Sequence, residues 1–353
     1  MNKSIHDIIF TDKPASVLEE KLLGLQSSRV AVLVDENTKK HCLPLIEKAL
    51  PHDHVLIEIE SGEQHKNLNT CIEIWKVLTN QAFDRKGVMV NLGGGVIGDM
   101  GGFCAATYKR GIRFINMPTT LLAQVDASIG GKLGIDFDGF KNHIGMFREP
   151  DSVIISTIFM DTLIDREIRS GFAEVVKHAL ISDSMHFEDI SRNLWNKQNW
   201  HEVVPHSVTI KENVVIQDPQ EQGLRKTLNF GHTIGHAIET HYLNHADNPL
   251  LHGEAIAMGM IAETLLSSKK CGLSRNESQS AISYLMENFP LDRIPEKYFD
   301  AIIDLTIQDK KNRNGKVLSA LLEKIGQCAF DIELSKEELY WALNEYNRKI
   351  SAK

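Results

Sequence analysis

Features of exported, disulfide-rich or membrane proteins are missing from this sequence. Its five cysteines form no CxxC pair and are too sparse for a disulfide framework, so we expect reduced thiols in a cytoplasmic protein. Asp7 and Asp12 interrupt the only hydrophobic stretch near the N-terminus, and no export signal is expected. No run of about eighteen uncharged apolar residues occurs, so we expect no membrane span.

Positive charge is also in deficit, with 39 lysines and arginines against 47 aspartates and glutamates. The formal net charge of -8 argues against a general nucleic-acid binder, so any anion site must be local. With 42% hydrophobic and 24% charged residues, the composition is typical of a folded protein. A chain of 353 residues is longer than a domain with one hydrophobic core usually is, which predicts two domains. We expect a small-molecule ligand, with neither nucleic acid nor membrane as partner.

Residues 1–155 alternate short apolar runs with helical patterns, which predicts an α/β domain with a parallel sheet. Residues 29–37 and 54–63 are expected to be strands. Residues 69–81 show apolar positions at helical spacing and are expected to form a helix. A further strand is expected to run into a glycine turn and a helix at residues 88–106.

Residues 156–353 have a different texture. Long helical segments replace the strand alternation, and these include SGFAEVVKHALIS, HSVTIKENVVIQ, HTIGHAIETHYL and GEAIAMGMIAETLLSS. We therefore predict a second, mainly α-helical domain.

The glycine turn contains Gly93, Gly95 and Gly98, which formally make a GxGxxG pattern. Such turns let backbone N–H groups and a helix N-terminus approach a pyrophosphate. Asp35 at the end of an earlier strand is a candidate for a ribose contact, and a carboxylate there favours NAD over NADP. The alternative is a packing turn beside a solvated acid.

His232 and His236 lie four residues apart, on one face of a predicted helix. Such pairs are often solvated or packed in a core. Glu174 on another apolar helix and His252 before a third favour a metal site, because two histidines and a carboxylate leave positions open for substrate on a catalytic zinc. The alternative for Glu174 is a surface pair with Lys177, three residues later.

Basic residues recur beside these motifs in an otherwise acidic chain. Gathered around one site, they would hold a substrate with more than one negative charge, such as a phosphate and a carboxylate. These residues are Arg110, Lys132, Lys141, Lys177, Lys211 and Arg225.

Longer motifs carry a more specific resemblance. The run GGGVIGDMGGFCAATYKRG, then MPTTLLAQVDASIGGKLGID and KNHIGMF, resembles the central block of 3-dehydroquinate synthases. The segments SGFAEVVKHALI, DPQEQGLRKTLNFGHTIGHAIE, LHGEAIAMGM and DKKNRNGKV are similar to the family's remaining blocks, in its order. The resemblance implies a Rossmann-like nucleotide-binding domain followed by a mainly helical metal- and substrate-binding domain.

The resemblance also implies a set of site residues. Glu174, His232 and His252 become the metal ligands, so His236 moves to the substrate side. Around NAD it implies Asp35, Asn37, Glu63, Lys66, Gly94, Gly95, Val96, Asp99, Thr119, Thr120, Leu122, Lys141, Phe159, Thr162 and Leu163. For the substrate it implies Asp126, Lys132, Asn142, Lys177, Lys211, Arg225, Asn229, His236 and Lys310, with Arg110 reaching the phosphate.

The implied reaction converts 3-deoxy-D-arabino-heptulosonate 7-phosphate to 3-dehydroquinate and phosphate, in the shikimate pathway of aromatic amino-acid biosynthesis. It runs through transient oxidation by NAD, β-elimination, reduction and aldol closure, with zinc or cobalt as the metal. The family also suggests a homodimer. Leu133-Gly134 and Asp136-Phe137 depart from its usual Thr-Gly and Asn-His, from which we expect altered packing rather than lost chemistry.

Three alternatives stay open at this point. Another sugar-phosphate cyclase would act on sedoheptulose 7-phosphate or glucose 6-phosphate, which lack the carboxylate. A metal-dependent polyol dehydrogenase of the glycerol dehydrogenase type would consume NAD stoichiometrically. An inactive NAD-binding paralogue would act only as an interaction module.

Overall fold

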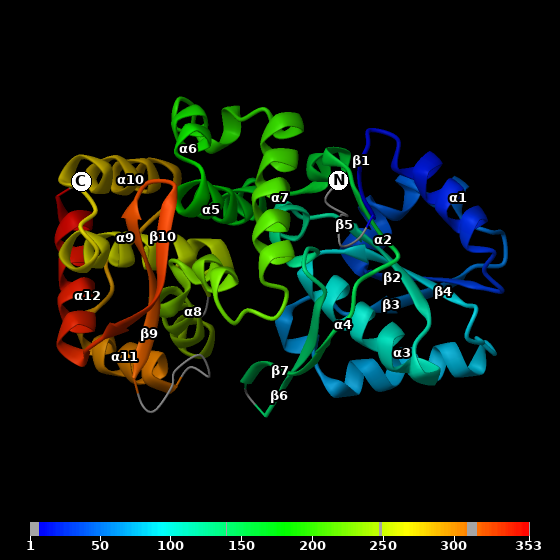
Figure 1. Cartoon of the computed structure of the whole chain (residues 1–353). Coiled ribbons are helices and arrows are strands. Elements are labelled where there is room, and N and C mark those ends of the chain that lie inside the picture. Colours follow the sequence, from blue (N-terminus) through cyan, green and yellow to red (C-terminus); the bar gives the residue numbers. More distant parts are fainter. Residues whose placement is uncertain (1–6, 139, 247–248, 309–315, 353) are drawn as a thin grey trace. The chain divides into compact units, whose positions relative to one another are not determined.

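The computed structural model describes residues 7–138, 140–246, 249–308 and 316–352. The chain divides into two compact units, of which unit 1 ends at Ile164 and unit 2 begins at Asp165 (Figure 1). The sequence-based boundary lies earlier, after residue 155. The helical turn η6 (Thr157–Thr162) stays with unit 1 because Phe159 is fully buried in the core of that unit.

Unit 1 is built on a parallel sheet, whose order in the described part is β1-β8-β5-β4-β2-β3. The strands are β1 (Asp7–Phe10), β2 (Val30–Asp35), β3 (Val55–Ile59), β4 (Val88–Gly93), β5 (Arg113–Pro118) and β8 (Ser152–Ile155). The apolar runs VAVLV and VMVNL form the central strands β2 and β4, because a parallel sheet is covered on both faces. This confirms the predicted α/β fold.

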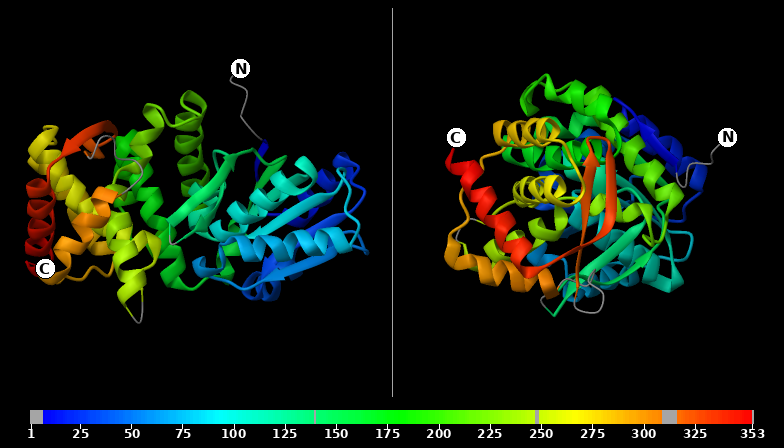
Figure 2. Two further views of the ribbon diagram at one scale, coloured as in Figure 1. Left: turned by 90° about the horizontal axis from the view of Figure 1, so that it is seen from below. Right: turned by 60° about the vertical axis from the view of Figure 1, so that its left-hand side comes forward.

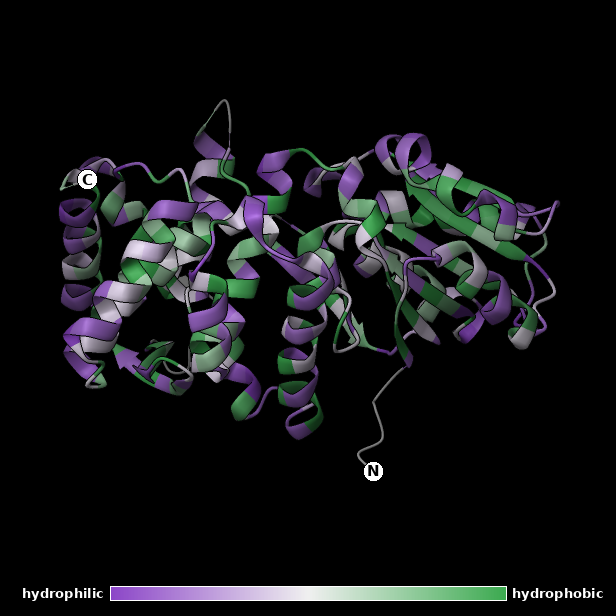
Figure 3. Ribbon diagram, turned by 90° about the horizontal axis from the view of Figure 1, so that it is seen from above, coloured by the Kyte–Doolittle hydropathy of each residue, from purple (hydrophilic) through white to green (hydrophobic). Residues whose placement is uncertain are grey.

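Helices cover the two faces of this sheet, and two apolar clusters fill the space between (Figure 1). Along β2, Leu33 packs in one cluster and Val32 and Val34 in the other, as the alternation of a strand requires. The central strands are accordingly mostly hydrophobic (Figure 3). The helices and helical turns are α1 (Pro14–Leu25), α2 (Glu36–His41), η1 (Leu43–Leu45), η2 (Glu47–Ala49), η3 (Glu63–His65), α3 (Leu68–Asn80), α4 (Gly95–Thr107), η4 (Tyr108–Arg110) and η5 (Ala123–Ala127).

The strand order reverses beside β2. The chain passes from β2 outward to β3, and then returns to β4 on the other side of β2. Ligands of open parallel sheets bind beyond the carboxyl ends of the strands at such a switch point. Asp35 ends β2 and Gly93 ends β4, so the predicted acid and glycine turn lie at this point.

Unit 1 also contains an antiparallel hairpin that the sequence did not predict, β6 (Lys132–Phe137) with β7 (Phe140–Phe147). A bridge between Asn67 and Asp136 ties it to the loop after β3. Leu133, one of the departures from the family pattern, is buried in the core beside α4.

Unit 2 is mainly helical, as predicted. Its elements are α5 (Asp165–Ser182), α6 (Ser184–Ser191), η7 (Trp195–Lys197), α7 (Trp200–Gln217), η8 (Leu224–Asn229), α8 (His232–His245), α9 (His252–Lys270), α10 (Arg275–Asn288), η9 (Glu296–Tyr298), α11 (Phe299–Gln308) and α12 (Lys336–Ser351), with an unpredicted hairpin of β9 (Val317–Lys324) and β10 (Gln327–Leu334). Helix α9 is buried along most of its length and contacts α5, α8, α10 and α12. The hairpin packs on it (Figure 2), where the Leu322 amide donates to Ser267 Oγ at 2.9 Å. Among the described helices, none is long and apolar enough to cross a membrane.

Candidate metal and cofactor sites

Three helices of unit 2 bring the predicted metal ligands together. Glu174 lies in the middle of α5, while His232 and His252 are the first residues of α8 and α9. Glu174 Oε1 lies 3.5 Å from Nε2 of His232 and 3.5 Å from Nε2 of His252. Two ligand atoms that each bind a tetrahedral zinc at about 2.1 Å stand about 3.4 Å apart. Oxygen and nitrogen donors at these separations therefore fit a divalent ion.

The far nitrogen of each imidazole has a partner that fixes the ring. Nδ1 of His232 lies 3.1 Å from the Phe230 carbonyl oxygen, and Nδ1 of His252 lies 3.1 Å from Glu239 Oε2. An N–H at Nδ1 leaves the Nε2 lone pair for a metal, and this carboxylate–histidine pairing is usual around bound metals. Burial alone would lower the pKa of His252, but the Glu239 and Glu174 carboxylates raise it to about 10. Without a metal both ring nitrogens therefore carry protons at neutral pH, and a divalent ion would displace the proton at Nε2.

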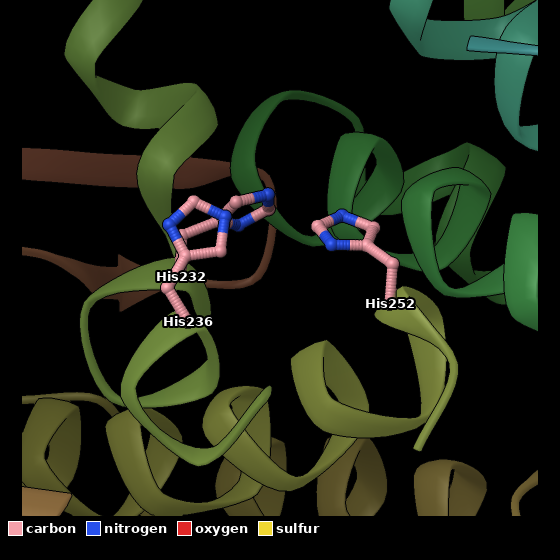
Figure 4. Close-up of side chains that lie close together, drawn as sticks. All are labelled: His232, His236 and His252. Carbon is pink, nitrogen blue, oxygen red and sulfur yellow. The ribbon is translucent and has the colours of Figure 1, made fainter. Parts of the chain in front are cut away.

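His236 follows His232 by one helical turn, and its ring faces the same space as those of His232 and His252 (Figure 4). One ring nitrogen from each of the three lies within 4.8 Å of the others. The ring centroids of His236 and His252 are 5.8 Å apart. Geometry alone thus allows His236 either as a fourth ligand or, as the family resemblance implies, as a neighbour of the bound substrate.

Close helix contacts hold the three ligand positions. A Cβ at Gly259 of α9 would collide with the Gly231 carbonyl oxygen, so only glycine lets α8 approach α9 this closely. The buried Glu263 carboxylate accepts the amides of Gly231 at 2.6 Å and Ile234 at 3.0 Å, and so caps the helix that begins at His232.

A second anchor ties α9 to α5. Arg166 donates two hydrogen bonds to Glu254, from Nε at 2.8 Å and from Nη2 at 2.7 Å. Such bidentate pairs fix both distance and orientation. Glu254 also accepts the Leu251 amide at 2.8 Å, immediately before His252. The start of α9 is therefore held rigidly against the helix that carries Glu174.

Cationic residues of unit 2 are buried near these helices. The Lys177 ammonium pairs with Glu174 Oε2, and this pair is buried rather than on the surface. Lys177, Arg225 and Lys211 are 1%, 2% and 6% exposed, on α5, η8 and α7, which pack against one another. Arg225 donates to the Pro219 carbonyl at 2.7 Å, and Asn229 donates to Glu221 at 2.9 Å. Buried cations of this kind favour an anionic ligand.

The predicted NAD residues of unit 1 follow the carboxyl ends of five parallel strands. Asp35 ends β2 and Asn37 follows it, Glu63 and Lys66 follow β3, and the glycine turn lies at the end of β4. Thr119, Thr120 and Leu122 follow β5, while Phe159, Thr162 and Leu163 follow β8. Helix α4, which contains Val96 and Asp99, begins after Gly94, and no side chain caps it. Uncapped N–H groups at a helix start suit a pyrophosphate. A small pocket lies here, lined in part by Gly94, Gly95 and Pro118.

Lys66 links several of these residues. Its buried ammonium donates to Asp99 Oδ2 at 2.7 Å and to Asn142 Oδ1 at 2.7 Å. Burial opposes the charge, but Asp99 and then Glu63 raise the pKa of Lys66. Asp136 Oδ1 accepts the Asn142 amide at 2.7 Å, which supports the left-handed conformation of Asn142 at φ 49°. The departure at Asp136 therefore orders the hairpin rather than disturbing it.

The remaining predicted site residues lie at scattered positions. Lys141 Nζ lies 3.9 Å from Glu63 Oε1, and Lys132 begins β6 at the surface. Asp126 lies in η5 after β5. Arg110 lies beyond the C-terminal end of α4, and Lys310 lies outside the described residues.

Two acidic residues around the candidate metal centre were missed in the sequence. Glu239 follows His232 by seven residues and His236 by three, so all three share one helix face. That spacing could have identified Glu239. Glu263 gave no comparable signal, because its role depends on which helix packs against α9.

Comparisons with known proteins identify the family of this chain. The family model described as 3-dehydroquinate synthase N-terminal matches residues 56–170, and the one described as 3-dehydroquinate synthase C-terminal matches residues 171–312. A 3-dehydroquinate synthase from Parabacteroides distasonis is 40% identical over 337 residues, covering 94% of this chain and 95% of the relative.

Two solved structures share the fold. A 2-epi-5-epi-valiolone synthase from Streptomyces hygroscopicus, with NAD+ and Zn2+ bound, has a TM-score of 0.85 at 24% identity over 99% of this chain and 98% of its own. A 2-deoxy-scyllo-inosose synthase complexed with carbaglucose-6-phosphate, NAD+ and Co2+ has a TM-score of 0.84 at 24% identity, over 96% of each chain. Together with the family models and the relative, the ligand geometry leads to one assignment: the chain belongs to the 3-dehydroquinate synthase family.

Proposed function

We propose that the chain converts 3-deoxy-D-arabino-heptulosonate 7-phosphate to 3-dehydroquinate and phosphate, with NAD and a divalent metal, zinc or cobalt. The observation that carries this proposal is the position of Glu174 Oε1, 3.5 Å from Nε2 of both His232 and His252. Family membership at 40% identity supports the substrate.

Glu174, His232 and His252 would hold the metal, and the residues at the carboxyl edge of the unit 1 sheet would hold NAD. When bound, the metal lowers the pKa of a substrate hydroxyl, and NAD accepts and later returns a hydride. The uncapped start of α4 would receive the pyrophosphate of NAD, with Asp35 near its ribose.

The buried cations of unit 2 would bind and orient the anionic ends of the substrate. Lys177, Lys211 and Arg225 are preorganised by burial and stabilise negative charge where it develops. Asn229 and His236 would complete this side, with Asp126, Lys132, Asn142 and Lys310 as further candidates. Loss of phosphate by β-elimination needs little from the protein beyond this positioning, because the departing phosphate can itself take the proton.

Phosphate release tests the proposed reaction. The purified protein, with catalytic NAD and zinc, should release phosphate from the heptulosonate phosphate, and a chelator should abolish the release. His252→Ala should also abolish it while the fold persists, whereas His245→Ala, an exposed histidine of α8, should retain it.

Alternative substrates complete the design. Turnover of sedoheptulose 7-phosphate or glucose 6-phosphate in place of the heptulosonate phosphate would refute the proposed substrate. Net accumulation of NADH with glycerol would refute the reaction type.

We further propose a homodimer. Arg110 lies past the end of α4, whose thirteen residues rise about 20 Å from the glycine turn. A phosphate bound near the carboxyl ends of the strands is therefore out of reach of Arg110 of the same chain. A second copy of the chain could supply this arginine. The hairpin residues Phe140 and Phe147 are 56% and 59% exposed, which supports an apolar contact between copies.

Subunit complementation tests this arrangement. Arg110→Ala and His252→Ala should each be inactive alone. If active sites are shared, a mixture after subunit exchange should regain about a quarter of the parent activity, because half the dimers are mixed and each has one complete site. No recovery in demonstrably mixed dimers would contradict the shared site.

The cytoplasm is the proposed compartment. All five cysteines lie in the described part and are free thiols. Reduced thiols are typical of cytosolic proteins.

A further inference from the structure

Unit 1 has a second cavity, which lies at the amino ends of the sheet strands, whereas the predicted NAD residues lie at the carboxyl ends. It has a volume of about 270 Å³ and is lined in part by Leu25, Arg85, Lys86, Arg113 and Arg148. Leu25 ends α1, Lys86 precedes β4 and Arg113 begins β5, so the cavity lies at the amino ends of the strands. It is therefore separate from the glycine turn.

Four cations surround this cavity, in a chain whose net charge is -8. None of its described lining residues is acidic. The neighbouring Asp84 carboxylate is engaged elsewhere, by the Ser28 hydroxyl at 2.5 Å and the Lys86 amide at 2.8 Å. Within the part of the chain that the structure describes, no carboxylate pairs with any of the four cations. The cavity thus has a concentrated positive charge.

Backbone carbonyls hold the guanidinium groups in place. Arg85 Nε donates to the Lys109 carbonyl at 3.1 Å, and Arg113 Nη2 donates to the Lys86 carbonyl at 3.2 Å. A guanidinium has five N–H donors, so each retains donors for a ligand. Because these side chains are already fixed, binding an anion would cost little conformational entropy.

Arg148 is the most firmly placed of the four. Its Nη2 donates to the Ile112 carbonyl at 2.9 Å, and its Cζ lies 6.0 Å from the Phe114 ring centroid. A Cβ at Gly111 would collide with its Nη1, and Gly111 also has φ 112°, so only glycine allows this packing. The cavity wall is therefore built around the arginine.

We propose that this cavity is a second anion site, which binds a small molecule carrying two linked or neighbouring phosphate groups. Four cations exceed what one phosphate needs, and bidentate arginine donors match phosphate oxygens. Ligand pockets usually measure about 300–1,000 Å³, so this cavity suits a small ligand rather than a dinucleotide. The site is independent of the proposed catalytic function.

Isothermal titration of the NAD- and zinc-loaded protein with inorganic pyrophosphate tests the site. In Arg85→Gln/Lys86→Gln, whose side chains are exposed, we expect the Kd of this site to rise at least about tenfold. Arg148→Gln should give a similar rise, with circular dichroism confirming the fold. A parallel titration with fructose 1,6-bisphosphate separates the two sources: tighter binding of the sugar indicates an organic ligand, and tighter binding of pyrophosphate an inorganic one.

Two controls make the result decisive. Lys211→Gln, on the catalytic side of unit 2, should keep the affinity of this cavity, as should Arg192→Gln, an exposed arginine of unit 2. Binding lost in Lys211→Gln but kept in Arg85→Gln/Lys86→Gln would assign the anion to the catalytic residues and overturn the proposal. Equal weakening in Arg192→Gln, or no binding to the parent protein, would overturn it as well.

Discussion

Glu239 Oε2 lies 3.1 Å from Nδ1 of His252, with Nε2 of the same ring turned toward Glu174. The carboxylate thereby sets both the orientation of the imidazole and its basicity. Helix α8 thus contributes two residues to the candidate metal centre, His232 at its start and Glu239 two turns later.

Glu239→Gln should weaken zinc binding by about 10–100-fold, because an amide cannot stabilise the charge that the imidazole acquires on binding a metal. Competition with a chromophoric chelator measures the affinity. Glu287→Gln, a glutamate of α10, is the matched control and should bind zinc as the parent does. Parent-like affinity in Glu239→Gln would exclude this role.

Gly259→Ala should destabilise unit 2 by about 1–3 kcal/mol or more, because the new methyl group meets the Gly231 backbone rather than a movable side chain. Urea denaturation measures the loss, and zinc affinity should fall with it as α8 shifts. Gly24→Ala in α1 has open space around its Cβ and should be neutral or slightly stabilising. Equal stability of the two variants would contradict the close helix contact.

Lys66→Met should cost about 3 kcal/mol, since it leaves the partly buried Asp99 without its cation. Urea denaturation again provides the measurement, and NAD affinity should drop in parallel. The double variant Lys66→Met/Asp99→Leu should recover much of the stability, because no lone charge remains. A double variant as unstable as the sum of the singles would argue against coupling.

Acid should destabilise unit 2 through His186. Burial and then His206, whose ring stacks on it at 3.9 Å, lower the pKa of His186 to about 4, against 6.5 for an unperturbed histidine. The unfolded chain therefore binds the proton first. The contribution to stability is fully present above pH 6.5 and is lost as pH falls toward 4.

His186→Phe keeps an aromatic ring but cannot titrate. Its free energy of unfolding should therefore change less between pH 6.5 and 4 than that of the parent. Urea denaturation at several pH values provides the comparison. Asp183 also faces this pair, with Oδ2 2.9 Å from His206 Nε2. The pKa of Asp183 is lowered, so the stability that this carboxylate contributes is lost only at a lower pH. An identical slope in both proteins would rule out His186.

Local pattern accounts for what the sequence predicted well. The apolar run at residues 29–37 contains β2, and the helical spacing at residues 69–81 matches α3 within a residue at each end. The His232 and His236 pair could be recognised because both lie on one helix. Their assignment to different roles came from the family resemblance rather than from spacing.

Non-local packing explains what the sequence left out. The hairpin of β9 and β10 is rich in leucine and glutamate, which also favour helices, and its strands are specified by pairing and by packing on α9. Glu263 resembles a solvated glutamate of any helix until the neighbouring helix is in place. Buried charge was therefore the hardest property to predict.

Helix α9 has two roles in the proposed site, since its first residue is a candidate metal ligand and the rest of the helix fills the centre of unit 2. Mutations that would retune the ion therefore disturb the scaffold, and mutations in the scaffold disturb the ion.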